Sequence, residues 1–526
     1  MAKNQATEVN RLREFHRRLS DIAIGHAGLR GTAQTVAKSR RIASRGALAA
    51  TFAVVIFVGT LLLNTPWAQA SGLWSWETVP GAAFTWQRFW LAVLNNLFTA
   101  TSATCVTGLS VVNVSSYYST FGKWVVVGCV QLGGIGLMTL GTAIVSALLG
   151  RASIGNETQV MQASGAQSIG SVRTLLWRTV RYVVGFETAG ALILAWRYRM
   201  LTDFSLLHCF GYGFFHSVNG MCNAGLTLHS DNLATIGQDP IYMLTITALV
   251  TIGGIGFFVL SNMFHLKFWR RDLRRRGRLS LHAWLVLWSS AFIFLVGGTL
   301  WTLLEIGHSL GPSRLGDFIG ALSSFQWGAA WESLLAMVYQ WQTGVCQAAM
   351  ARTAGFNFVN MGMIDSPANL LTILLMLIGG SPGSMAGGIK TTTVVVLLLT
   401  IRAYVKGNRE VQIHHRTVSD SVCREAMVLC VFYIGIVFLF FFLLLLSEPM
   451  LVSQCGDFAL FYEVASAFGT VGLSLNATGL LTPVGRILIV LAMFLGRIGP
   501  ISVVMMMSDR APIRRVRCPE EKVTVG

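Results

Sequence analysis

Long apolar runs alternate with shorter, partly polar stretches along almost the whole chain. A helix that spans a bilayer needs about 20 predominantly apolar residues, and eight runs are near this length or longer. They cover residues 47–65, 122–149, 172–196, 240–265, 282–304, 366–402, 424–447 and 483–507. The sixth run is interrupted by glycine and polar residues. The pattern therefore predicts an all-α polytopic membrane protein with eight spans.

A shorter, more polar stretch follows the first, third, fifth and seventh spans. These stretches cover residues 86–113, 207–230, 331–360 and 458–476, and each is too short or too polar to cross a membrane. A short helix that enters the membrane and continues as extended backbone is typical of a re-entrant pore loop, because non-helical backbone is tolerated there only beside a wet cavity. The sequence thus predicts four pseudo-repeats of helix, pore loop and helix around a central pore.

Each pore-loop stretch contains a glycine flanked by small or apolar residues, and the four glycines are 117, 130 and 117 residues apart. The four turns are Val106, Thr107 and Gly108; Asn223, Ala224 and Gly225; Thr353, Ala354 and Gly355; and Thr470, Val471 and Gly472. One such turn alone is more often a helix-packing glycine. Four in register predict a selectivity filter, in which backbone carbonyls replace an ion's hydration shell, with glycine supplying the unusual backbone angles.

A second set of glycines keeps the same register. It begins 24 to 28 residues after each filter glycine, at Gly133, Gly253, Gly379 and Gly496. The repeats are therefore predicted at 47–149, 172–265, 282–402 and 424–507, with a basic N-terminal extension over 1–46 and a C-terminal tail over 508–526.

Composition supports a membrane protein, since only 12% of the residues are charged against about 25% in soluble domains. The net charge of +17 comes mainly from basic residues in the N-terminal extension and in the segments outside the apolar runs, and the positive-inside rule then assigns 150–171, 266–281, 403–423 and 508–526 to the cytoplasmic side. This placement predicts cytoplasmic termini and pore loops that enter from outside, and it argues against a nucleic-acid partner. The nine cysteines include no CxxC pair, and we expect them to be small buried apolar groups.

The four turns, the segment 379–393 and the sequence Gly496-Arg497-Ile498-Gly499-Pro500 resemble the Ktr/Trk/HKT superfamily of potassium transporters, over residues 47–507. The resemblance is nearest to the Ktr-type membrane subunit KtrB, which has eight spans. It implies a potassium-selective pore in the bacterial cytoplasmic membrane, with potassium bound at filter carbonyls, and a homodimer with cytosolic nucleotide-binding regulatory subunits of the KtrA or TrkA kind. Glycine in all four turns favours potassium over sodium by this analogy. The long basic extension and Met385, where a small polar residue is common, depart from the family pattern.

The segment 379–393 cannot remain helical, because it contains a proline and several glycines. The alternatives are a kinked helix and a flexible gate loop beneath the filter, and the resemblance supports the loop. Its gate residues are then Gly379, Gly380, Ser381, Pro382, Gly383, Gly387, Gly388 and Lys390. Lys390 could be a mobile plug or an interfacial anchor. No strand precedes these glycines, so we expect no nucleotide binding in this chain.

Arg497 lies in the last span with about ten largely apolar positions after it. Because a charge at membrane depth is costly and usually functional, we expect Arg497 to face the pore under the filter and to form the gate with the loop. Glu187 and Glu463 could relay cations, or be buried carboxylates that bind backbone, which the sequence favours. His216 and Asn223 are expected to be scaffold hydrogen-bonding residues.

No nucleophile–base constellation and no pair of catalytic carboxylates is evident, so the chain is not expected to be an enzyme or to carry a cofactor. Two alternatives remain. A sodium-selective or sodium–potassium symporting relative would share the fold, with sodium as a coupling ion. A membrane enzyme or lipid-handling protein would not predict four glycine turns in register. Channel-like and sodium- or proton-coupled transport stay open at this point.

Overall fold

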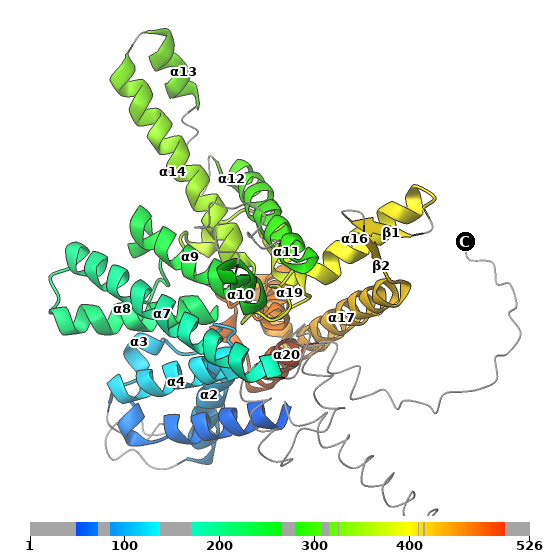
Figure 1. Cartoon of the computed structure of the whole chain (residues 1–526). Helices are drawn as coiled ribbons and strands as arrows, with labels where there is room; N and C mark the ends of the chain where they lie inside the picture. The colour runs from blue at the N-terminus through cyan, green and yellow to red at the C-terminus, as the bar shows by residue number, and fades with distance from the viewer. Residues whose placement is uncertain are drawn as a thin grey trace, which may run out of the picture.

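The computed structural model describes residues 49–71, 85–136, 170–265, 279–306, 315–324, 326–408, 410–413 and 416–499 (Figure 1). The predicted N-terminal extension, the C-terminal tail and most of the predicted basic loops at 150–171 and 266–281 lie outside these residues. Nearly all of the regular elements in the described chain are helices. The exception is a short antiparallel hairpin of β1 (Val411–Ile413) and β2 (Arg416–Val418), which the all-α prediction did not include.

The first two repeats each contain a first helix, a helix that leads to the glycine turn, and a second helix. In the first repeat these are the helix Ala49–Leu63, α2 (Trp86–Thr104) and α4 (Thr120–Gly136), with the short α3 (Val114–Tyr117) before α4. In the second they are α7 (Gly170–Leu201), α8 (Leu206–Cys222) and α9 (Pro240–Ile255), which α10 (Phe257–His265) follows.

The last two repeats have the same order with more interruptions. The third contains α11 (Leu281–Phe292), a π-helical turn η4 (Ile293–Gly297), α12 (Gly298–Glu305), α13 (Leu315–Ser323), α14 (Trp327–Ala351), α15 (Ser366–Leu377) and α16 (Thr391–Val405). The fourth contains α17 (Asp420–Ser447), α18 (Pro449–Cys455), α19 (Asp457–Gly469) and α20 (Pro483–Ile498). In Figure 1, α13 and the start of α14 project from the body of the molecule.

Glycines with positive φ interrupt two of the predicted spans. The predicted span 240–265 is divided at Gly256, where φ is +87°. In the fourth repeat, α20 ends at Ile498 and Gly499 follows with φ +82°. The two glycines occupy the same place in their repeats, three residues after Gly253 and Gly496. Since only glycine adopts these angles cheaply, the breaks are encoded by residues that the sequence pattern alone had assigned to continuous spans.

Apolar side chains cover much of the outer surface. Six tryptophans in the described residues are more than 60% exposed: Trp67, Trp86, Trp90, Trp288, Trp327 and Trp331. Two described helices, Leu281–Glu305 and Asp420–Ser447, are long and apolar enough to cross a membrane alone, and five shorter apolar helices accompany them. A water-soluble protein rarely exposes so much apolar surface, whereas a lipid-facing surface is apolar with tryptophan near its edges.

In every repeat, the end of the first helix is tied to the start of the second, by different chemistry each time. The ties are Ser119 N to Ala68 O (2.9 Å), Arg197 Nε to Asp239 Oδ2 (2.9 Å), Asp365 N to Glu305 Oε1 (3.1 Å) and Thr482 N to Glu448 Oε1 (2.9 Å). Each repeat thus has its own contact between the end of its first helix and the start of its second.

Candidate functional site

Four helices end beside the centre of the molecule, each three or four residues before a predicted filter glycine. They are α2, α8, α14 and α19, and their last residues are Thr104, Cys222, Ala351 and Gly469. The C-terminal end of a helix carries partial negative charge. Four such ends directed at one place favour a cation there.

The four turns share an unusual backbone conformation. The residue two before each glycine has positive φ, with values of +57° at Val106, +60° at Asn223, +116° at Thr353 and +49° at Thr470. The glycines also have positive φ, between +66° and +97°. Positive φ is uncommon for residues other than glycine, and unusual above all for a β-branched one. Its recurrence at one position in four repeats identifies these turns as a single structural device.

The four glycines form a closed ring. A Cβ placed on Gly108 would lie 3.2 Å from the Cα of Gly225, and one on Gly225 would lie 2.9 Å from the Cα of Gly355. The ring continues from Gly355 to Gly472 at 3.1 Å and returns from Gly472 to Gly108 at 2.8 Å. Segments that are far apart in the sequence therefore meet around one axis, as the registered turns predicted.

A carbonyl oxygen accompanies each glycine in this ring. The Cβ of any residue larger than glycine would overlap the carbonyl of the neighbouring turn's preceding residue, which is Ala224, Ala354, Val471 or Thr107 in order around the ring. Glycine is thus required twice, by its positive φ and by the close approach of another backbone. Each turn thus brings a backbone carbonyl oxygen to the ring, and carbonyl oxygens are ligands that can replace the water around an alkali cation.

The helices hold three of the turns in the same way. The backbone N–H groups of Thr107, Ala224 and Val471 donate to the carbonyls of Ser102, Asn219 and Ser466, at 2.8 to 2.9 Å. The hydroxyls of Ser102 and Ser466 also accept from the N–H groups of Gly108 and Gly472, both at 3.0 Å. In the third turn, Ala354 N and Gly355 N both donate to Met350 O instead. The third turn is therefore held differently.

A cavity of about 450 Å³ opens beyond the ring, and all four repeats line it. Its walls consist of the residues that follow the glycines, including Ser110, Asn232, Asn360 and Ser474. Among the described residues that line it, none is Lys or Arg, and Asp231 is the one carboxylate. Asn232 Nδ2 also donates to the carbonyl of Gly355 at 3.1 Å. The cavity is a polar vestibule suited to a hydrated cation.

The predicted interruption of the sixth span is present, as an ordered loop between α15 and α16. Gly379 N donates to Ile389 O at 2.8 Å and Thr391 N donates to Gly380 O at 3.1 Å, so the two ends of the loop are held together. A Cβ on Gly379 would overlap the carbonyl of Gly387. The structure therefore excludes a simple kinked helix.

The loop contacts the second and fourth repeats. Ser381 N donates to Gly254 O (3.1 Å), Met385 N donates to Gly253 O (3.3 Å), and the hydroxyl of Ser381 donates to Ile255 O. On the fourth-repeat side, a Cβ on Gly387 would overlap the hydroxyl of Thr470 in the filter turn. The loop thus lies against the filter and against the second helices of the neighbouring repeats.

Arg497 connects this loop to the first repeat. Its Nη1 donates to Met385 O, and its Nη2 donates to Gly133 O at 2.8 Å. The side chain is 3% exposed. Arg497 lies in the last turn of α20, not in the middle of a helix as the apolar run suggested, because Gly499 ends the helix. There the C-terminal end of the helix stabilises the positive charge.

Lys390 also binds the loop. Its Nζ donates to Ala386 O at 2.7 Å, and the residue is half-buried. The other predicted gate residues, Ser381, Pro382, Gly383 and Gly388, lie in the same loop, and all but the half-buried Pro382 are buried. Lys390 therefore stabilises the loop from within in this conformation.

The second set of glycines has one role in the first, second and fourth repeats and another role in the third repeat. A Cβ on Gly133, Gly253 or Gly496 would overlap the carbonyl of Thr104, Met221 or Phe468, at the end of that repeat's filter helix. Gly379 meets its own loop instead. The register was informative, but the third repeat has exchanged helix packing for the loop.

The remaining polar residues form a scaffold behind the turns. Glu463 accepts hydrogen bonds from Ser474 and Thr478, both at 2.5 Å, and Glu187 accepts one from Gln131 Nε2 at 3.0 Å. His216 Nδ1 lies 2.9 Å from Tyr212 O, and Asn223 pairs with Thr353 Oγ1 at 3.1 Å. These contacts favour the buried-carboxylate and scaffold interpretations over a cation relay. Seven of the eight cysteines in the described residues are buried, as expected.

Arg352 directly precedes the third glycine turn and is 4% exposed, and it was not among the residues predicted from the sequence. The corresponding residues of the other turns are Cys105, Cys222 and Gly469. An arginine at a position that is otherwise small, inside an apolar stretch, was a signal available in the aligned repeats.

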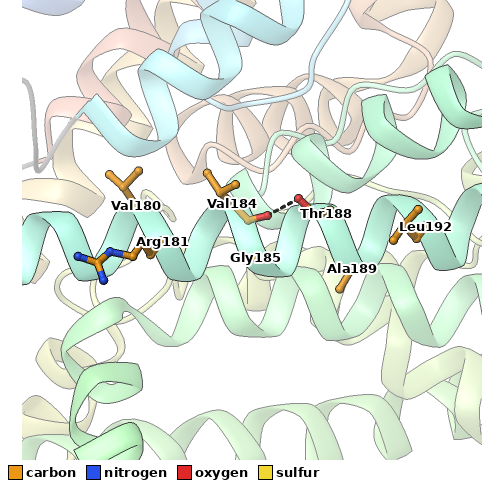
Figure 2. Close-up of a pocket in the computed structure, with 7 residues that line it drawn as sticks. All are labelled: Val180, Arg181, Val184, Gly185, Thr188, Ala189 and Leu192. Carbon is orange, nitrogen blue, oxygen red and sulfur yellow. Dashed lines mark hydrogen bonds between the residues drawn. The ribbon is translucent and has the colours of Figure 1, made fainter.

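A groove on the outer side of α7 is separate from the filter (Figure 2). It is lined by Val180, Arg181, Val184, Gly185, Thr188, Ala189 and Leu192. All of these residues come from one face of one helix, and none belongs to a glycine turn or to the loop. The groove therefore has no part in the candidate ion pathway.

The fold and the ring of backbone carbonyls define a cation transporter of the membrane. The family model described as "TrkH: Cation transport protein" matches residues 77–514, and the chain belongs to this family of cation transporters, which are not enzymes.

Among individual proteins, the chain is 31% identical to "Ktr system potassium uptake protein B" of Bacillus subtilis, over 91% of this chain and 96% of that protein. It is 30% identical to the protein of the same name from Vibrio alginolyticus, over 83% and 89%. It is 27% identical to "Potassium/sodium uptake protein NtpJ" of Enterococcus hirae, over 94% and 100%. The crystal structure of the potassium transporter TrkH from Vibrio parahaemolyticus shares the fold, with a TM-score of 0.57 at 15% identity, over 87% of this chain and 84% of that one.

Proposed function

We propose that this chain forms the pore for potassium uptake across the bacterial cytoplasmic membrane. The observation that carries the proposal is the closed ring of Gly108, Gly225, Gly355 and Gly472, with one backbone carbonyl from each repeat beside it. These carbonyls, and those of the residues before them in each turn, replace the hydration shell of potassium. The ion is the cargo, and the chain needs no resident cofactor.

In the proposed topology, eight spans and four re-entrant pore loops surround the pore, and both termini are cytoplasmic. The basic segments at 266–281 and 508–526 support the orientation through the positive-inside rule.

The loop 378–390 and Arg497 form the gate in this proposal. Three cationic side chains donate to three different loop carbonyls: Arg497 to Met385, Lys390 to Ala386 and Arg352 to Gly379. Fixed positive charge beside an ion path raises the electrostatic barrier to a cation. The described conformation is therefore closed to cations at the level of the loop.

We further propose a homodimer that binds cytosolic nucleotide-binding subunits, which control the gate. The names of the Bacillus and Vibrio relatives describe a "Ktr system" with a component B, which supports a complex of several components. The basic segment around Arg270–Arg276 and the pair His414 and His415 are the candidate docking surfaces from the sequence, and both lie outside the described residues.

The second candidate is a sodium-selective pore or a sodium–potassium symporter of the same fold. Its support is the similarity to a relative named for potassium and sodium uptake. Glycine in all four turns favours the potassium pore, because a side chain at the ring would change the ion preference. In the sodium-selective alternative, Gly108→Ser changes selectivity little.

Rubidium uptake by a potassium-transport-deficient cell tests the proposal. Cells that express the chain with its regulatory subunit are expected to accumulate rubidium, with little competition from sodium. Sodium uptake that exceeds rubidium uptake would support the second candidate. A protein present in the membrane that moves neither ion contradicts both.

A further inference from the structure

Arg352 is the residue that joins the third filter turn to the loop. It caps α14, and Thr353, Ala354 and Gly355 follow it directly. Its side chain is almost fully buried, and among the described residues it has no carboxylate within ion-pair distance. A buried charge without a counter-charge is costly unless hydrogen bonds satisfy it.

Three hydrogen bonds from the guanidinium satisfy this requirement, and two of them reach the loop. Nε donates to Gly379 O at 3.1 Å, at the start of the loop, and Nη2 donates to Thr391 Oγ1 at 3.2 Å, where α16 begins. Nη1 donates to Ser290 Oγ on α11 at 2.8 Å. The fork geometry of arginine allows one side chain to hold three acceptors in fixed positions.

The first helix of the repeat supports Arg352 from the other side. The π-helical turn η4 follows α11, and it places the ring of Phe294 5.4 Å from the guanidinium carbon. A cation over an aromatic face is attracted to it, more strongly in a dry environment. A single π-turn inside a helix is frequently found at functional sites. Because Ser290 and Phe294 hold the guanidinium on the side of the first helix, a shift of the loop ends displaces the third glycine turn.

The third turn is also the one that departs from the common pattern. Thr353 has φ +116°, against +49° to +60° at the equivalent residues, and Ala354 N bonds to Met350 O. The side chain of Thr353 pairs with Asn223 of the second turn. A continuous series of contacts therefore runs from the second turn through the third and Arg352 to both ends of the loop.

We propose that Arg352 is a positioning residue that couples ion occupancy of the filter to the ordering of the loop 378–390. This inference rests on the proposed function, because it takes the ring as the ion site. Binding of potassium orders the third turn, Arg352 transmits that order to Gly379 and Thr391, and the loop exchanges its amide hydrogens more slowly. By reciprocity, a loop released from the gate position weakens ion binding at the ring.

Hydrogen–deuterium exchange of the full chain in lipid nanodiscs tests the proposal, in potassium and in sodium at equal ionic strength. Two groups of peptides are compared: those that cover the loop, and those that cover the first filter turn at Gly108. The variants are Arg352→Lys, which keeps the charge but loses the fork, and Thr391→Val, which removes one loop acceptor. Thr400→Val is the matched control, because its hydroxyl donates to Val396 O within α16, away from the ends of the loop.

In the unmodified chain and in Thr400→Val, potassium is expected to slow exchange at both the first turn and the loop. In Arg352→Lys and Thr391→Val, the first turn keeps its response to potassium. The response of the loop falls by about fivefold, as expected for a coupling free energy of ordinary size. A role limited to stability would alter exchange equally in both ions and leave the response to potassium intact.

The outcomes separate this inference from the proposed function. If potassium slows exchange at neither place in the unmodified chain, the ring is not a potassium site and the proposed function fails. If potassium protects the first turn but not the loop, or protects the loop equally in the unmodified chain and Thr391→Val, the coupling through Arg352 is overturned while the proposed function stands.

Discussion

Gly472 of the fourth turn lies against Gly108 of the first, so that a Cβ on Gly472 would be 2.8 Å from the Cα of Gly108. This contact closes the ring, because it joins the two ends of the repeated part of the chain. The ring has no room for a side chain at any of its four glycines. Its dimensions therefore depend on all four repeats at once.

Gly472→Ser is expected to reduce the preference for potassium over sodium by about tenfold, or about 1.4 kcal/mol. The new side chain would overlap Thr107 O, and serine does not readily adopt φ +96°. Rubidium and sodium uptake by the same cells measure the ratio. Gly128→Ser in α4 is the control, since no atom lies within 4 Å of its added Cβ. An unchanged ratio in Gly472→Ser contradicts the assignment of the ring as the filter.

Arg497→Gln is expected to increase potassium flux in the absence of a regulatory subunit. The substitution removes the positive charge and the donors to Met385 O and Gly133 O, so the loop is released and the electrostatic barrier falls. Flux from potassium-loaded proteoliposomes measures the effect. Arg402→Gln, on the exposed side of α16, provides the control.

Deletion of the loop is likewise expected to increase potassium flux in the absence of a regulatory subunit. A protein that lacks residues of the 381–388 segment but retains α15 and α16 is expected to conduct without regulation. Unchanged flux in both the deleted protein and Arg497→Gln would rule out a gate made by the loop and Arg497.

Gly253→Ala is expected to lower the stability of the protein and Gly254→Ala to raise it, although the residues are adjacent. The Cβ at position 253 would overlap Met221 O, whereas the one at 254 would meet only Asn223 Nδ2 at 3.4 Å. Overpacking costs about 1–3 kcal/mol, while alanine in place of glycine within a helix gains about 0.5–1 kcal/mol. Thermal unfolding in detergent measures both. A melting temperature that is equal for the two variants would contradict the close packing of α9 on the filter helix α8.

Glu463→Gln is expected to lower the free energy of unfolding by about 1–3 kcal/mol, and the melting temperature with it. Both carboxylate oxygens accept hydroxyl hydrogen bonds, from Ser474 and Thr478, and one of them would become an amide that cannot accept. Glu410→Gln, on an exposed segment beside Thr417, is the control and should have little effect. If potassium flux falls in Glu463→Gln while the melting temperature is unchanged, Glu463 acts on the ion and not on the scaffold.

Much of the architecture is encoded in short-range patterns. The glycine turns were predictable because four copies in register of a residue with special backbone freedom require a shared geometry. The interruption after α15 was predictable because glycine and proline at that density exclude a helix. The breaks after Ile255 and Ile498 were not, since each follows from a single glycine whose φ depends on what packs around it.

The contacts between repeats were beyond the sequence. Nothing local to Arg352 indicates that it reaches Gly379 and Thr391, because those acceptors are brought to it by the fold. Arg497 was identified from its charge within an apolar run, but its partners and its place at a helix end were not. Sequence periodicity therefore located the four glycine turns, while the structure located the side chains that connect them to the loop.

Potassium and sodium flux into proteoliposomes, with and without a regulatory subunit, tests the central claim most directly. Potassium flux is expected to be well above sodium flux, to rise when an active regulatory subunit is present, and to lose its preference over sodium in Gly472→Ser. Sodium flux equal to or greater than potassium flux in the unmodified protein would contradict the potassium-selective ring.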